Sequence, residues 1–334
     1  MGKRKHRDKY FYLAVMMFAV FFMCVLLYYY SFLHQYQTFY LNSESVFKII
    51  NLQTNIVPQG IDYLEDENSF IVSGYEYPKG YTKIVVVDSD QNRYEKTIIN
   101  SKGKKFKWHS GGIACHGNFV YVTGGNSKCY VLDKNDLLNP ELSEVTIIGT
   151  IDTDNNSSFC FVYGNCLFVG EYQYRTKFLT DEQHHILSPQ GNLNTAMVFA
   201  YPFSKTEKFG VSETPIMALS IGSSIQGMCM DKQGRMYLSA SSSNFDESIL
   251  YVYDFRKVVQ TVDSTIAQDS KVIPVFIFED SALIDKLYVP PNAEGVTADR
   301  SSIYLLFESA SKRFKYGWLF GTQYVYRVDT KKLF

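Results

Sequence analysis

An internal repeat constrains the fold of this chain more than any other feature. Each of its five units begins with a short apolar strand, continues through a tight polar turn and enters a second strand that ends in small or polar residues. The units begin at Gln59, Gly111, Ser158, Gln226 and Glu294. Two of the turns are Gly-Asn pairs, which suit two-residue hairpins because such hairpins need positive φ angles.

Further apolar runs follow each hairpin. A third run usually ends in Asp, and a fourth is expected in EKTIIN, EVTIIGTI, IMALSI and VIPVFIF. Four antiparallel strands per unit, with about 50 to 70 residues between unit starts, are typical of the blade of a β-propeller. The fifth unit shows no fourth run, whereas an extra strand, residues 45–51, precedes the first unit.

We therefore predict an all-β fold, a five-bladed β-propeller over residues 45–334. The strand of residues 45–51 is expected to complete the last blade, because ring closure removes open sheet edges. An open β-sandwich is the alternative interpretation.

The N-terminal segment is predicted to be a membrane anchor. Residues 10–33 form an uncharged apolar run that is long enough to cross a bilayer as a helix. Five cations precede the run and none follows it until Lys48, so the positive-inside rule places residues 1–9 in the cytoplasm and the propeller outside it, after a short linker of residues 34–44. A cleaved signal peptide is the alternative, although it would need a shorter apolar core and a small-residue cleavage site.

The balance of charged residues limits the classes of partner that the chain is expected to bind. Without residues 1–9, the chain holds 28 Lys and Arg against 33 Asp and Glu. Because this balance is mildly acidic, no nucleic-acid partner is expected.

Five cysteines follow the anchor, an odd number that cannot pair completely within one chain. A turn at Gly164 would place Cys160 opposite Val169 and Cys166 opposite Tyr163, a register that argues against a disulfide between the two cysteines.

One hairpin carries a family resemblance. The pattern formed by Asp231, Gly234, Tyr237 and Ser239 is similar to the hairpin of NHL-type and gluconolactonase-like propellers, and residues 45–334 resemble the broad superfamily that includes the YncE-like proteins. This resemblance implies the propeller fold in a membrane-anchored form. It brings no enzyme signature with it.

Two classes of loop in such a propeller open at the same end of the ring. They gather polar and aromatic side chains there, as small-molecule sites do. The candidate ligand-binding residues are Gln59, Tyr75, His109, Glu171, Tyr172, Gln226, Glu294 and Glu308. The structural alternative is that these side chains satisfy backbone groups at strand ends.

Three of these candidates are carboxylates, namely Glu171, Glu294 and Glu308. Because carboxylates near a narrow axis repel one another unless a cation or a proton intervenes, they are candidate ligands for a metal, with Ca²⁺ as the possible cofactor.

Two long insertions leave the same end. Residues 171–194 could fold across the mouth as a lid, whose charged and His residues could contact a ligand: Arg175, Lys177, Asp181, Glu182, His184 and His185. Residues 308–322 carry Lys312, Arg313, Lys315 and Trp318, and cations beside an aromatic ring could bind an anionic or sugar ligand. For each insertion, an ordinary solvated loop is the alternative.

Two functions remain open. The first is a non-catalytic extracytoplasmic propeller that binds a carbohydrate, a cell-envelope component or a protein through its polar end. The second is a calcium-dependent hydrolase. Glu294-Gly295 resembles the E-G pair that supplies a metal ligand in five-bladed calcium-activated nucleotidases, and that reading makes His109 a candidate catalytic base. No GxSxG, HExxH, GxGxxG or P-loop motif is present.

Overall fold

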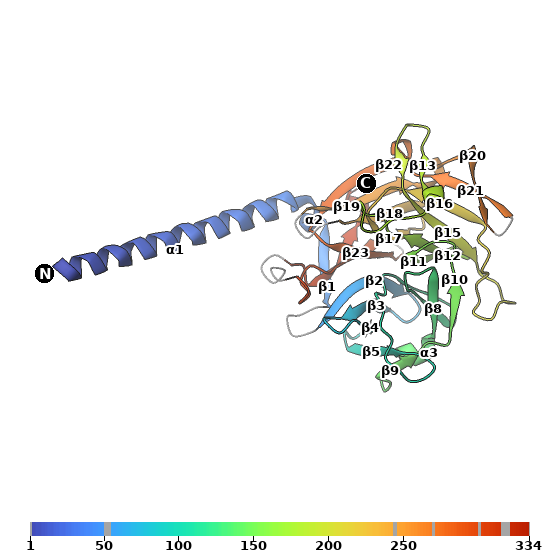
Figure 1. Ribbon diagram of the computed structural model, residues 1–334, viewed down its shortest axis with the longest axis horizontal. Helices are drawn as coiled ribbons and strands as arrows, with labels where there is room; N and C mark the ends of the chain where they lie inside the picture. The colour runs from blue at the N-terminus through green and yellow to red at the C-terminus, as the bar shows by residue number, and fades with distance from the viewer. Residues whose placement is uncertain are drawn as a thin grey trace.

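Helix α1 (Gly2–Gln35) projects from the β domain as a single long rod (Figure 1). The computed structural model describes residues 2–49, 55–242, 246–268, 271–299, 302–314 and 321–333. Residues 8–35 of α1 are long and apolar enough to cross a membrane, and the most apolar part of this stretch is not buried by the rest of the chain. A helix that exposes so much apolar surface needs an apolar environment, so it is a candidate membrane anchor.

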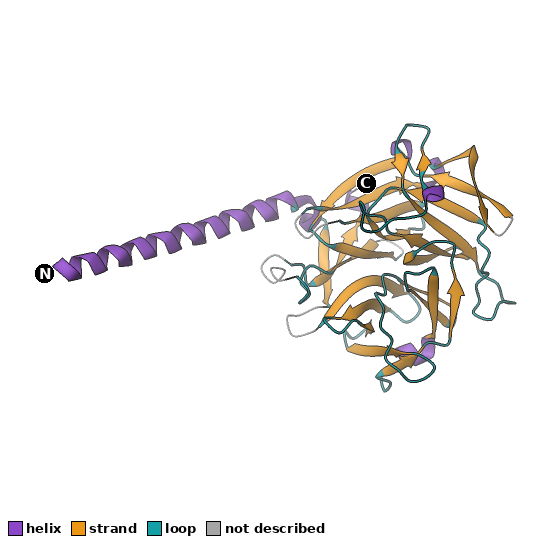
Figure 2. Cartoon of the chain, viewed as in Figure 1, coloured by secondary structure: helices purple, strands orange, loops and turns teal. Residues whose placement is uncertain are grey.

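The rest of the chain is almost entirely β-structure, as Figure 2 shows. Blade 1 consists of β2 (Ile56–Leu64), β3 (Ser69–Glu76), β4 (Tyr81–Val87) and β5 (Arg93–Ile99). Blade 2 consists of β6 (Ile113–His116), β7 (Phe119–Thr123), β8 (Lys128–Asp133) and β10 (Gly149–Asp152). Blade 3 is built on β11 (Ser157–Tyr163), β12 (Cys166–Glu171), β15 (Ala196–Pro202) and β16 (Met217–Ile221).

The remaining blades complete the ring. Blade 4 consists of β17 (Ile225–Met230), β18 (Arg235–Ala240), β19 (Ser248–Asp254) and β22 (Leu283–Val289). Blade 5 consists of β23 (Ala293–Ala298), β24 (Ser302–Phe307), β25 (Tyr324–Asp329) and β1 (Ser43–Lys48). The innermost strands contact one another in the order β2, β6, β11, β17, β23 and back to β2, so the predicted five-bladed propeller is confirmed.

Glycines allow the five innermost strands to approach closely around the axis. A Cβ added to Gly60 would lie 2.7 Å from the Cα of Gly112, and one added to Gly295 would lie 2.8 Å from the backbone nitrogen of Ile61. Such distances leave no room for a side chain. Blade 3 has Phe159 at the equivalent position, and Gly170 opposite it on β12 leaves space for the ring.

The N-terminal strand closes the ring as predicted. β1 pairs antiparallel with β25, from Ser43 opposite Val328 to Lys48 opposite Tyr324. Of the predicted strand 45–51, residues 50 and 51 lie outside the described part of the chain. The expected linker of residues 34–44 contains the end of α1 and the short helix α2 (Gln37–Leu41), whose Phe39 is fully buried between blades 4 and 5.

The outer strands correct two expectations. VIPVFIF does not form the fourth strand of blade 4, because β21 (Lys271–Ile277) pairs parallel with β16 of blade 3 and carries β20 (Val259–Gln268) on its outer edge. β22 takes the expected place in blade 4. EVTIIGTI is likewise divided, since β9 (Glu144–Thr146) pairs parallel with β5 of blade 1 and only β10 belongs to blade 2. Alternating apolar residues fix which face of a strand is buried, but they do not specify its neighbour.

The cysteines are all unpaired, and their register matches the prediction. Cys160 lies opposite Val169 and Cys166 opposite Tyr163 on the β11–β12 hairpin. Burial raises the pKa of Cys129 to about 12, so this thiol is a packed apolar group rather than a nucleophile.

Candidate functional site

A repeated bulge redirects one side chain in each of four of the five blades. In β2, Pro58 pairs with Gly74 and Gly60 with Ser73, so Gln59 is an extra residue without a partner across the strands. The same irregularity occurs at Ser158 in β11, at Gln226 in β17 and at Glu294 in β23. Because a bulge redirects the extra residue, these four side chains leave the normal alternation at the same end of the ring.

This end of the ring holds a cavity of about 1000 Å³. Six of the eight predicted ligand-binding residues line it: Gln59, His109, Tyr172, Gln226, Glu294 and Glu308. Asn292 and Trp108 also line it, although neither was predicted from the sequence. A signal for Asn292 was present, because it follows two prolines directly before a strand and has a φ of 61°, an angle that asparagine tolerates better than most residues.

Two buried carboxyl groups form the floor of the cavity. Glu308 accepts hydrogen bonds from Gln59 Nε2 at 2.7 Å and from Asn292 Nδ2 at 3.3 Å. Glu294 accepts one from Gln226 Nε2 at 3.3 Å. The two carboxyl groups also hydrogen-bond to each other. A hydrogen bond between two carboxyls requires a proton, since ionised carboxylates only accept.

Burial governs the acidity of this pair. Removal from water raises the pKa of Glu294 well above its ordinary value, and the neighbouring charge of Glu308 raises it further. The pKa of Glu308 is also raised, mainly by burial, although the Arg313 guanidinium and the donors from Gln59 and Asn292 oppose the rise. The pair therefore holds a proton in a pH range where exposed glutamates have lost theirs.

An arginine and two rings form one wall. Arg313 donates from Nη1 to the hydroxyl of Tyr75, whose ring centroid lies 4.8 Å from that of His109. Part of His109 is open to the cavity, yet the surrounding protein and then the charge of Arg313 lower its pKa to about 4. At neutral pH His109 is uncharged. Tyr75 is the buried part of this wall and is not among the residues that line the cavity, contrary to its prediction as a ligand-binding residue.

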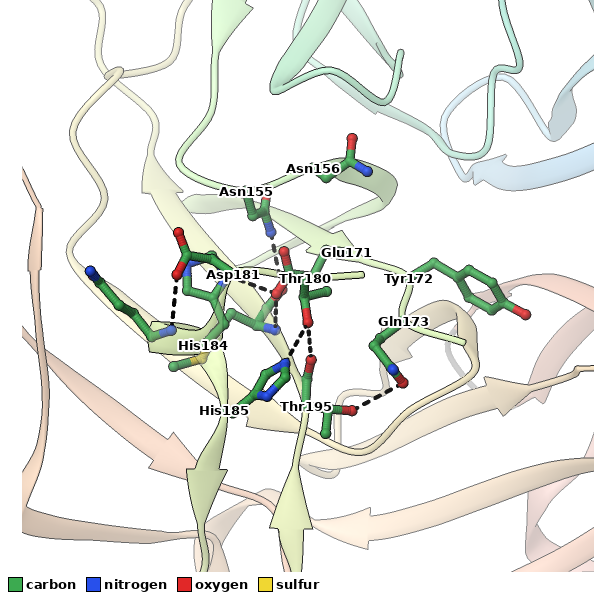
Figure 3. Close-up of polar contacts among 12 residues, drawn as sticks. Asn155, Asn156, Glu171, Tyr172, Gln173, Thr180, Asp181, His184, His185 and Thr195 are labelled. Carbon is green, nitrogen blue, oxygen red and sulfur yellow. Dashed lines mark hydrogen bonds and ion pairs between the residues drawn. The ribbon is translucent and has the colours of Figure 1, made fainter. Parts of the chain in front are cut away.

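Glu171 lies apart from the other two glutamates. Figure 3 shows its side chain pointing away from that of Tyr172 and toward the insertion that follows β12. Its Oε1 lies 2.8 Å from Nδ1 of His184 and accepts a hydrogen bond of 2.9 Å from the backbone N–H of Met197. Glu171 and His184 are both buried. Glu171 therefore fastens the insertion to blade 3 and does not join Glu294 and Glu308 at the floor.

The first insertion contributes an aromatic wall. Residues 173–195 include η1 (Glu182–His184) and the small hairpin β13 (Ile186–Leu187) and β14 (Leu193–Asn194). Within this segment, Tyr174, Lys177 and Phe178 line the cavity. The ring of Phe178 lies 5.5 Å from that of Tyr172, and Thr180 fixes the segment internally by donating to the backbone oxygen of Thr195 at 2.6 Å (Figure 3).

The second insertion contributes Arg313 and Phe314 to the cavity. Lys312 points to Asn55 instead, at 2.8 Å, and does not line the cavity. Lys315 and Trp318 lie outside the described residues.

The described side chains contain no group of three or more His, Cys, Asp and Glu residues arranged to hold a metal ion. Gln59, Asn292 and Gln226 already donate to the oxygens of the glutamate pair, which a Ca²⁺ ion would need as ligands. The donor set suits hydrogen bonding to a polar molecule better than it suits calcium.

Comparisons with known proteins concern the fold. No family model matches the chain, and no curated protein matches it in sequence. Among solved structures, the glutaminyl cyclase of Myxococcus xanthus is 10% identical, with a TM-score of 0.44 over 86% of this chain and 96% of that one. A gluconolactonase from Xanthomonas campestris is 9% identical, with a TM-score of 0.40 over 84% and 78% of the two chains.

The hydrazine synthase of Kuenenia stuttgartiensis is 10% identical, with a TM-score of 0.39 over 77% of this chain, and the match spans only 56% of that chain. The similar structures also include the Dos1 propeller. At these identities the likeness extends to the fold and to no particular family.

Proposed function

We propose that this protein is a membrane-anchored, extracytoplasmic propeller that binds a small carbohydrate in its axial cavity. The observation that carries the proposal is the pairing of a polar floor with aromatic walls in one cavity of about 1000 Å³. This volume lies at the upper end of the range of about 300 to 1,000 Å³ for small-molecule pockets, so it has room for an organic ligand rather than a single ion.

The two surfaces of the cavity match the two surfaces of a sugar ring. Sugar hydroxyls donate and accept hydrogen bonds at the ring edge, and the carboxamides of Gln226 and Asn292 carry both donor and acceptor groups. Gln59 offers its carbonyl oxygen, because its Nε2 already donates to the backbone oxygen of Pro58 and to Glu308. The apolar C–H face of a sugar packs against aromatic rings, which Tyr172 and Phe178 supply. A cell-envelope glycan is a ligand that combines these features.

Binding is favoured over hydrolysis by the state of the floor. The oxygens of Glu308 accept from Gln59 and Asn292, and Glu294 is hydrogen-bonded to Glu308 itself. A general base must take up a proton readily, but the glutamate pair is already engaged, and a pKa lowered to about 4 makes the His109 imidazole a weak base.

The proposed extracytoplasmic location of the propeller rests on the positive charges that precede helix α1. Five cations precede α1, at residues 3, 4, 5, 7 and 9, and the positive-inside rule then leaves the propeller on the extracytoplasmic side. Residues 10–33 are the proposed contact with the membrane.

The test is a binding screen with the full-length protein in nanodiscs against an oligosaccharide panel, read by calorimetry. Tyr174→Ala and Phe178→Ala should weaken any hit by about tenfold, the equivalent of about 1.4 kcal/mol, because each removes an aromatic wall. Tyr288→Ala is the matched control, since this half-exposed tyrosine lies on β22 and does not line the cavity. A panel without hits, or equal losses in all three variants, would contradict the proposal.

A further inference from the structure

The charges in the cavity do not cancel. Among the described residues that line it, the ionisable side chains besides tyrosine are His109, Lys177, Glu294, Glu308 and Arg313. The hydrogen bond between the two glutamates needs a proton, so the pair together carries about one negative charge. His109 is neutral at pH 7. Two cations therefore face one anion.

Arg313 balances the single negative charge of the glutamate pair. It lies close enough to Glu308 to lower the pKa of that carboxyl, and its Nη1 donates to Tyr75. An arginine held by a hydrogen bond next to a buried carboxylate is the partner that such a charge requires.

Lys177 is the second cation of the cavity. It lies on the first insertion beside Phe178, lines the cavity and is exposed to water there. No Asp or Glu side chain in the described part of the chain forms an ion pair with it. The buried contact between Glu171 and His184, called the latch below, fastens the segment that carries this lysine to blade 3.

We infer that the ligand is an acidic saccharide, whose anionic group lies at the Lys177 side of the mouth while its hydroxyls meet the carboxamides of the floor. This inference rests on the proposed carbohydrate-binding function and names the ligand class. A carboxylate, as in a uronic acid, and a phosphate ester share the required chemistry, because each offers several acceptor oxygens to an ammonium group. A calcium ion or a cationic sugar would instead meet an excess of positive charge.

The experiment compares acidic saccharides with neutral counterparts of the same shape, using the full-length protein in nanodiscs. Digalacturonate is measured against its dimethyl ester, and glucose 6-phosphate against glucose, at low and high salt. At low salt we expect the acidic member of one pair to bind about fivefold more tightly, and the preference to shrink at high salt, because ions screen an exposed charge pair. The saccharide pair whose acidic member binds more tightly shows whether the anionic group is a carboxylate or a phosphate.

The variants assign the preference to one residue. Lys177→Gln should reduce the preference to less than about twofold, and Lys177→Arg should retain it, since arginine keeps the charge. Lys312→Gln is the control, because that lysine contacts Asn55 and does not line the cavity. If acidic and neutral members bind equally in the parent, or if Lys312→Gln abolishes the preference as Lys177→Gln does, the inference fails while carbohydrate binding stands. If no saccharide binds, the proposed function fails with it.

Discussion

Glu294 shows how one residue acquires unusual chemistry from its backbone. A bulge in β23 turns its side chain toward the axis, where it meets Glu308, which follows β24 directly in the chain. On a regular strand, neighbouring side chains alternate between faces, and an axial carboxyl pair would not form in this way. The cost of burying two carboxyls is reduced by one shared proton and by the amides of Gln59 and Asn292.

The raised pKa of Glu294 makes stability depend on pH. An unfolded glutamate has a pKa of about 4.3, and the folded one lies well above it. The folded state therefore binds the proton more tightly, and this stabilisation, fully present below the unfolded pKa, is lost as pH rises through the folded value. Glu294→Gln mimics the protonated acid. In thermal melts we expect the variant to gain stability relative to the parent as the pH rises above the unfolded pKa, because only the parent loses this stabilisation.

The control for this melt is Glu213→Gln, which alters an exposed glutamate in a loop. It should track the parent at each pH. A Glu294→Gln protein that loses stability relative to the parent as pH rises would show that the carboxyl is buried in its ionised form.

Calcium provides a second test at this scale. Two glutamates with engaged oxygens fall short of the six to eight oxygen ligands that Ca²⁺ prefers. We expect the same Tm for the full-length protein in calcium and in EGTA, since only a ligand that binds the folded state shifts Tm. A saturable rise in Tm that Glu294→Gln removes would instead establish an axial metal site.

At the scale of elements, the first insertion is a folded part of the cavity rather than a solvated loop. The buried contact between Glu171 and His184 joins its middle to the end of β12 (Figure 3). The backbone N–H of Thr195 also donates to Ile221 of β16 at 3.1 Å. These contacts place Tyr174 and Phe178 at the cavity without either latch residue touching it.

His184→Ala should therefore loosen residues 173–195 while the blades stay folded. Loss of a buried hydrogen-bond partner costs about 1 to 3 kcal/mol, because Glu171 stays buried with one donor fewer. Hydrogen exchange of the insertion amides should accelerate. His185→Ala is the comparison, since the imidazole of His185 contacts Thr180 within the insertion. Equal exchange in the two variants would argue against a latch.

β21 tests whether blade 3 really extends beyond four strands. Ile273 is buried in the core shared by blades 2 and 3, whereas its neighbour Val272 is 65% exposed. We expect Ile273→Ala to lower the free energy of unfolding by about 2 to 4 kcal/mol in urea, and Val272→Ala to change it by less than about 0.5 kcal/mol. Faster exchange should appear in β16. Faster exchange in β19 instead would return β21 to blade 4.

At the scale of the whole molecule, the anchor and the ring share one junction. β1 closes blade 5, and α2 directly before it buries Phe39 against Phe307 and Tyr326. Helix α1 is thus followed at once by residues that belong to the core. The propeller is held close to the end of α1, without a free tether between them (Figure 1).

Two truncated chains should distinguish the role of helix α1 as a candidate anchor from the role of β1 in closing the propeller ring. A chain that begins at residue 36 keeps Phe39 and β1, so it should remain a folded monomer once the anchor is gone. A chain that begins at residue 49 exposes the edge of β25 and should aggregate or melt at lower temperature. Size-exclusion chromatography and thermal melting compare the two. Similar behaviour would mean that β1 does not close the ring.

The sequence alone determined those features that depend on the order of residues within short segments of the chain. Apolar length predicted the long apolar helix, a candidate anchor, while the repeated hairpins and the unmatched strand before them predicted five blades and their closure. The aligned repeat starts also located Gln59, Gln226 and Glu294 at one end, because equivalent positions in each blade meet at the axis.

Only the tertiary structure decided the pairings between distant segments. Strand periodicity has no preference among partners, so the positions of β9 and β21 could not be derived from it. Glu171 and Glu294 also looked equivalent as carboxylates near strand ends. A bulge turns Glu294 to the axis, whereas Glu171 points to His184, thirteen residues further along the chain. A side chain's direction and partner depend on backbone geometry and packing, which no local pattern of residues records.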